Sequence, residues 1–158
     1  MRSVVIISIY LLIFGACYGQ WQAPNSGLRK NAIIVAPSIN PGLPEFMVTA
    51  SMVYERIIVQ GLGKRNSAFK AKIGGGAYGL WGESGQYLMG EFGLITGQKN
   101  HHFETGLGAF YGSSSFRFVS ASAGYRFQKP GGYFVFRSGV SFPEGIYFGF
   151  GVCFGKGN

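Results

Sequence analysis

Residues 131–154, "GGYFVFRSGVSFPEGIYFGFGVCF", decide the fold, because bulky apolar residues alternate with small or polar residues on both sides of a short break. A period of two is that of a β-strand, whose successive side chains point to opposite faces. The bulky face holds Phe134, Phe136, Val140, Phe142, Ile146, Phe148, Phe150, Val152 and Phe154. The other face holds Tyr133, Arg137, Gly139, Ser141, Gly149, Gly151 and Cys153. The stretch therefore predicts two strands, 132–142 and 145–154, joined by a tight turn.

Similar segments, separated by regular turn signals, extend back to residue 31. Glycine, proline, serine or asparagine interrupts the chain at the intervals typical of an all-β sandwich or barrel, and helix capping signals are absent after residue 20. The predicted strands cover residues 31–37, 46–59, 67–80, 86–97, 101–112, 116–128, 132–142 and 145–154. Their number and length match the smallest transmembrane barrels. The sequence thus predicts an all-β fold, an eight-stranded antiparallel up-and-down transmembrane β-barrel.

The residue types on the two strand faces indicate which face is inside. A soluble ligand-carrying barrel such as a lipocalin needs its bulky apolar face inside and its charges outside. The interior of an eight-stranded barrel is just wide enough for side chains, so several phenylalanine-rich faces would overfill it. The inverted arrangement fits, with glycine, serine and paired charges inside and apolar side chains toward lipid, where a closed barrel bonds every backbone group.

The charged residues within the strands share the inward face. The predicted polar network of the lumen consists of Glu55, Lys70, Lys72, Glu91, His102, Glu104, Arg126 and Arg137. Because an unpaired buried charge is costly, we expect these groups to form salt bridges that fill the lumen. The alternative is that some of them lie near the rims and are solvated.

The charges in the connections alternate between the two rims if the chain starts in the periplasm. The acidic residues of the odd-numbered connections, at the outer rim, are Glu45, Glu83 and Glu144. The basic residues of the even-numbered connections and the C-terminal end, at the periplasmic rim, are Lys64, Arg65, Lys99, Lys129 and Lys156. This separation supports an even number of strands.

The composition excludes several function classes. The chain of 158 residues contains no aspartate, which removes aspartate-based catalytic triads and EF-hand loops. Its net charge of +8 arises from scattered basic residues without a nucleic-acid motif, so we expect no nucleic-acid partner.

The N-terminus predicts export. Arg2 precedes an apolar run over residues 4–14, which is too short to span a bilayer and fits a secretory signal. The expected organisation is a signal peptide (1–19), a short periplasmic segment (20–30), an outer-membrane barrel (31–154) and a C-terminal tail (155–158). The alternative is lipidation at Cys17, since "FGAC" partly resembles a lipobox.

His102 and Glu104 lie on one face of a predicted strand, while His101 points the other way. Two ligands are fewer than a zinc site needs. Among eight-stranded barrels the nearest enzymatic precedent is the lipid A deacylase group, whose His–x–Ser strand motif is absent, because positions 103 and 104 are Phe and Glu. We therefore expect a lumen-lining pair, with no catalytic, metal or cofactor site.

Four segments carry a family resemblance: "KNAIIVAPS", "MVYERII", "KNHHFETGLGAFYG" and "AGYRFQKPGGYFVFRSGVSF". From about residue 30 to residue 154 the chain resembles the small outer-membrane β-barrel proteins common in Bacteroidota. The resemblance implies a barrel in the outer membrane of a Gram-negative bacterium, and it implies no reaction. The chain departs from the family in its very short outer connections and in carrying "GKGN" beyond Phe154.

The expected function is that of a non-enzymatic barrel, structural, adhesive or partner-contacting, with a side-chain-filled lumen and no conducting pore. Its expected partners are outer-membrane lipids, lipopolysaccharide and the barrel-assembly machinery. Two alternatives remain: a lipid-modifying enzyme similar to lipid A deacylase, and a lipoprotein barrel anchored through Cys17.

Overall fold

The structure is a computed structural model that describes residues 27–42, 46–62, 67–80, 82–113 and 117–156. The predicted signal peptide, Cys17, Glu45, Lys64 and Arg65 lie outside these residues.

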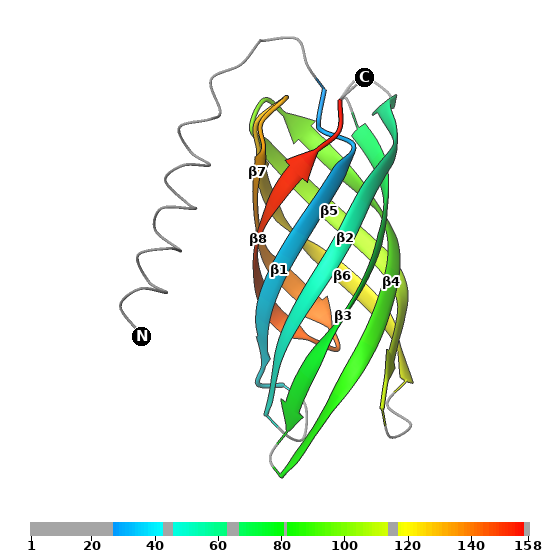
Figure 1. The fold of residues 1–158 in the computed structure, drawn as a ribbon, viewed down its shortest axis with the longest axis vertical. Helices are drawn as coiled ribbons and strands as arrows, with labels where there is room; N and C mark the ends of the chain where they lie inside the picture. The colour runs from blue at the N-terminus through cyan, green and yellow to red at the C-terminus, as the bar shows by residue number, and fades with distance from the viewer. Residues whose placement is uncertain (1–26, 43–45, 63–66, 81, 114–116, 157–158) are drawn as a thin grey trace, which may run out of the picture.

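Eight antiparallel strands close into a barrel in chain order, with β8 paired to β1 (Figure 1). The strands are β1 (Asn31–Asn40), β2 (Met47–Leu62), β3 (Ser67–Leu80), β4 (Glu83–Gln98), β5 (His101–Gly112), β6 (Arg117–Gln128), β7 (Phe134–Phe142) and β8 (Gly145–Phe154). The predicted eight-stranded antiparallel barrel is confirmed. Within the described part of the chain, no helix is long and apolar enough to cross a membrane.

Strand β1 runs past Pro37, where the prediction ended it. In the β1–β8 ladder the pairing steps from Val35 opposite Phe150 to Ser38 opposite Tyr147, with the same register on both sides of a short gap. Proline lacks a backbone N–H and cannot donate to a ladder. The register is continuous across the gap, so the proline interrupts the pairing locally without ending the strand.

The barrel has two unequal rims. We call the end with residues 27–30, 155–156 and the β2–β3, β4–β5 and β6–β7 connections the terminal rim, and the other end the opposite rim (Figure 1). The β3–β4 hairpin extends beyond its neighbours at the opposite rim (Figure 1). Strands β2 and β4 have 16 residues each, whereas β7 has 9 and β8 has 10, so one side of the wall is taller.

The wall is inverted relative to a soluble barrel. Large apolar side chains such as Leu88 and Val119 are each 66% exposed on the outside. Ionised side chains such as Arg126 and Glu104 are each 1% exposed. Large apolar side chains therefore lie on the outside of this wall, and ionised side chains lie inside it.

The lumen also contains a large apolar layer, which the prediction of a glycine, serine and charge filling missed. This layer consists of Met47, Val53, Tyr78, Tyr87, Met89 and Phe110. The rings of Tyr87 and Phe110 stack with centroids 4.2 Å apart. Gly85 leaves room for another ring of this layer, since a Cβ there would lie 2.6 Å from Cζ of Tyr78.

Candidate functional site: the polar lumen

A five-residue ion-pair cluster occupies the middle of the lumen, and Glu104 of β5 is its centre. Lys70 Nζ lies 2.8 Å from Glu104 Oε2, and Arg137 Nε donates to Glu104 Oε1. Arg126 Nη1 lies 3.4 Å from Glu104 Oε2. Glu55 completes the cluster, accepting from Lys70 Nζ at 3.1 Å and from Arg126 Nη1 at 2.5 Å. Two carboxylates thus share three cations from strands β3, β6 and β7.

The strand register places a second set of charges beside this cluster. Glu55 stands opposite Lys72 across β2 and β3, and Lys72 stands opposite Glu91 across β3 and β4. Lys72 and Glu91 form a second ion pair, and Ser120 Oγ donates to Glu91 Oε1 at 3.1 Å. Because inward positions recur every second residue, charges spaced by two along neighbouring strands form rows that meet inside the barrel.

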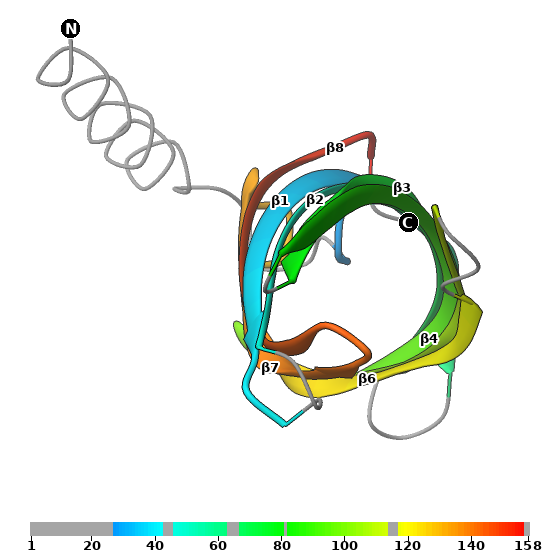
Figure 2. The same ribbon diagram turned by 90° about the horizontal axis from the view of Figure 1, so that it is seen from below.

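Glu144 is a further lumen carboxylate, so the prediction of a charge in a connection at the outer rim is wrong for this residue. It is 6% exposed, and its Oε1 accepts a hydrogen bond from the hydroxyl of Tyr87 at 2.6 Å. Its Oε2 accepts from Ser141 Oγ at 2.9 Å. Figure 2 shows the β7–β8 hairpin turned inward across the barrel opening. Asn40 and Ser38 of β1 hold this turn by donating to the carbonyl oxygens of Pro143 and Glu144, at 2.6 and 3.1 Å.

With Glu144 included, the lumen charges of the described residues balance. The carboxylates are Glu55, Glu91, Glu104 and Glu144, and the cations are Lys70, Lys72, Arg126 and Arg137. A cavity of about 20 Å³ lies between the ion pairs and Glu144, lined in part by Lys72, Arg137 and Ser141. That volume holds about one water molecule. The space between these ion pairs and Glu144 is therefore closely filled.

His102 and Glu104 both point inward but do not form the predicted pair. Among the described residues, His102 Nε2 lies 3.2 Å from the carbonyl oxygen of Gln128, and Glu104 bonds to the cations and to Tyr147 at 3.2 Å. The two side chains belong to different layers, because residues two apart on a strand are separated by almost 7 Å. His101 points outward, as predicted, and its Nδ1 lies 2.6 Å from the Tyr125 hydroxyl.

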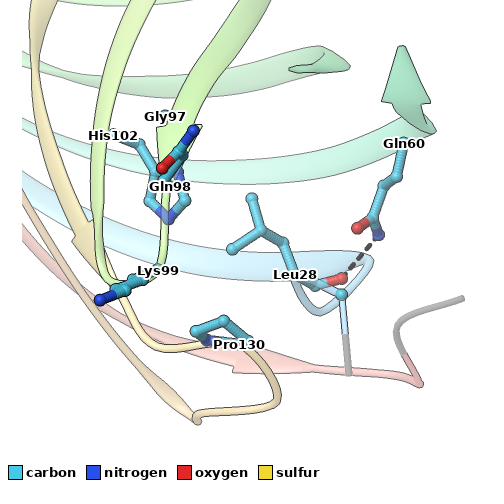
Figure 3. A pocket seen from close by; sticks show the side chains of 8 residues that line it. Leu28, Gln60, Gly97, Gln98, Lys99, His102 and Pro130 are labelled. Atoms are coloured by element: carbon cyan, nitrogen blue, oxygen red, sulfur yellow. Dashed lines mark hydrogen bonds between the residues drawn. The ribbon is translucent and has the colours of Figure 1, made fainter. Parts of the chain in front are cut away.

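His102 also lines a cavity of about 160 Å³ at the terminal rim (Figure 3). Leu28 and Pro130 form part of the wall beside Lys99. The carbonyl oxygen of Leu28 accepts a hydrogen bond from Gln60 Nε2 at 2.6 Å, so the segment before β1 covers this end of the lumen (Figure 3). Together with Ile57, Ala68 and Ile95, Leu28 forms an apolar layer at this rim.

The arrangement is one of mutual neutralisation. The carboxylates of Glu55, Glu91 and Glu104 face cations and that of Glu144 accepts two hydroxyl donors, so these groups are occupied by the protein itself. Among the described residues there is no group of three or more His, Cys, Asp or Glu that could hold a metal ion.

Comparisons with protein-family models, with curated proteins and with solved structures each found no match to this chain.

Proposed function

We propose that this chain is a transmembrane β-barrel of the outer membrane, of the small type common in Bacteroidota, with a structural or adhesive role. The observation that carries the proposal is the inverted wall. Exposed large apolar side chains occur on all eight strands; they include Ile33, Met52, Ile73, Leu88, Phe103, Val119, Val140 and Phe150. Monomeric soluble proteins rarely expose a continuous apolar surface of more than a few hundred Å².

A hydrocarbon environment accounts for both faces of this wall. Outward apolar side chains meet lipid, and the closed ladder leaves no strand edge with unpaired backbone groups. The inward charges avoid lipid by pairing within the lumen. The same sequence placed in water would expose its apolar face and bury its charges, which is unfavourable on both counts.

The filled lumen supports a role without conduction or catalysis. Apolar layers lie toward both rims, and the cavity beside the charged layer holds about one water molecule. His102 and Glu104, the pair that resembles part of a catalytic site, are engaged with Gln128 and with Arg137 and Lys70. The accessible parts of the molecule are then its lipid-facing wall and its rims.

Heat-modifiable gel migration of the membrane-extracted protein tests the proposal. A closed barrel in a membrane is expected to need detergent for extraction and to migrate faster unheated than boiled, because the closed ladder resists dodecyl sulfate until heated. A chain recovered in the soluble periplasmic fraction, with identical migration before and after boiling, would overturn the proposal.

A further inference from the structure

Among the described residues, most charges outside the lumen lie at the terminal rim, and all of those are basic. The described residues contain eleven lysines and arginines and five glutamates. The cations therefore outnumber the glutamates by six. Six cations also lie at the terminal rim, and we call them the basic collar: Arg29, Lys30, Arg56, Lys99, Lys129 and Lys156. Four of the glutamates lie in the lumen, and Glu83 lies at the opposite rim with Arg117. The net positive charge of the described residues is therefore concentrated at one end of the barrel.

The basic collar surrounds the barrel instead of forming a patch on one side. Arg29 and Lys30 precede β1, and Arg56 stands opposite Asn31, the first residue of β1. Lys99 lies between β4 and β5, on the far side of the closed sheet from β1. Lys129 follows β6, and Lys156 follows β8. A partner that meets all of these cations must itself extend around the circumference.

Polar-tipped aromatic side chains accompany the basic collar on the outer surface. Tyr54 donates a hydrogen bond to Asn31 Oδ1 at 2.7 Å, and Arg29 stacks over the Tyr133 ring at 3.7 Å. The predicted inward position of Tyr133 is wrong, because Tyr133 precedes β7 and is 46% exposed. On the other side His101 Nδ1 lies 2.6 Å from the hydroxyl of Tyr125. Aromatic residues of this kind mark the boundary between hydrocarbon and water in membrane barrels. The collar cations thus stand at the level where lipid headgroups would lie.

We propose that the basic collar binds the anionic headgroups of the phospholipid leaflet that surrounds the terminal rim. This inference rests on the proposed membrane location and adds the lipid class and the rim. A leaflet is the partner that encircles the barrel at the edge of its apolar wall, whereas an acidic protein would dock on one side. Opposite charges at such a surface attract with a strength that corresponds to about fivefold in affinity for each cation.

Electron spin resonance of lipid labels tests the proposal on the full chain in phosphatidylcholine bilayers. The label separates lipid that contacts protein from lipid in bulk. We expect spin-labelled phosphatidylglycerol to be enriched at the protein about fivefold over spin-labelled phosphatidylcholine. The preference should vanish in 1 M NaCl, where the screening length is about 3 Å.

The matched variants locate the effect. Combining Lys30→Gln, Arg56→Gln, Lys129→Gln and Lys156→Gln is expected to lower the enrichment to less than about half of that of the unaltered chain, since it removes four of the six collar cations. Within the described part of the chain, none of these four side chains makes a hydrogen bond or an ion pair. Heat-modifiable migration verifies that the variant is folded. Arg117→Gln, at the opposite rim, should keep the preference for phosphatidylglycerol.

Three outcomes contradict the proposal in different ways. Equal contact by both lipid labels would refute the collar while leaving a membrane-inserted barrel. Loss of the lipid preference in Arg117→Gln but not in the collar variant would show that the preference arises at the opposite rim. Binding of soluble polyglutamate through the collar, without lipid preference, would indicate an acidic protein partner. By contrast, absence of protein-contacting lipid with either label would refute the membrane location itself.

Discussion

At the scale of single residues, Glu104 is the carboxylate at the centre of the buried ion pairs. It meets Lys70, Arg126 and Arg137, and it also accepts a hydrogen bond from Tyr147. A buried ion pair is a weak source of net stability, because desolvation offsets the attraction between its members. Removal of one member is another matter, since the remaining charges are left buried and uncompensated.

We therefore expect Glu104→Ala to lower the free energy of unfolding by about 3–5 kcal/mol. Urea unfolding in lipid vesicles, followed by heat-modifiable migration, measures this change. Glu83→Ala is the control, because Glu83 is exposed and its loss should change stability by less than about 0.5 kcal/mol. Equal costs for the two variants would mean that the central cluster does not stabilise the barrel.

Tyr87 tests the inward turn of the β7–β8 hairpin. In Tyr87→Phe the Glu144 carboxylate loses its 2.6 Å hydrogen bond but keeps Ser141. A hydrogen bond to a charged group contributes about 1.5–3 kcal/mol, so we expect a loss in that range on urea unfolding. Tyr111→Phe is the control, since its exposed hydroxyl accepts from Arg117 at 3.0 Å and should contribute little. An unchanged free energy of unfolding in Tyr87→Phe would contradict the buried position of Glu144.

Sequence reasoning could predict the side on which a strand residue lies, but not its partners. Parity along β5 identifies His102 and Glu104 as inward. It does not reveal that Arg137 and Lys70 approach only one of them, because barrel closure and stagger decide which rows meet. Glu144 was missed as a lumen group for a different reason: a residue in a two-residue turn has no strand face from which to infer its direction.

At the scale of the elements, alternation was most informative where the two faces differed most in size. In β8 the outward residues are large and the inward ones include Gly149 and Gly151, and the predicted bounds match the structure. In β3 and β4 the contrast reverses near the opposite rim, where Tyr78 and Tyr87 point inward and Gly75 faces outward. The start of β4 at Glu83 was missed there, since glycine and serine suggested a longer turn.

Substitutions along β8 test the direction of its faces. Phe150 pairs with Val35 in the middle of β1, and Ile146 pairs with Ile39 near the end of β1. In a membrane barrel, an outward arginine costs about 2–4 kcal/mol at the bilayer midplane and about 0–1 kcal/mol near the interface. We expect Phe150→Arg to destabilise the vesicle-inserted protein by the larger amount and Ile146→Arg by the smaller. A cost that does not depend on depth would contradict a lipid-facing β8.

At the scale of the whole molecule, the narrow interior of the barrel determines which side chains lie inside and which lie outside. An eight-stranded barrel has an interior only wide enough for side chains. In this chain the interior holds a charged layer with equal numbers of cations and carboxylates, between two apolar layers. The other large apolar side chains and the net positive charge lie on the outside of the barrel. The closed topology followed from the number and even spacing of the strands, whereas the layering of the lumen depended on the stagger that closure imposes.

The most direct test of the central claim is a nitroxide scan along β8 from Ile146 to Val152, in a chain with Cys17→Ser and Cys153→Ser, reconstituted in vesicles. The scan measures accessibility of each label to oxygen, which concentrates in hydrocarbon, and to a water-soluble nickel complex. We expect a period of two residues, with oxygen accessibility highest at Ile146, Phe148, Phe150 and Val152 and nickel accessibility lowest near Phe150. Nickel-accessible labels at these four positions, or no alternation between neighbours, would contradict a lipid-facing wall around a charged lumen.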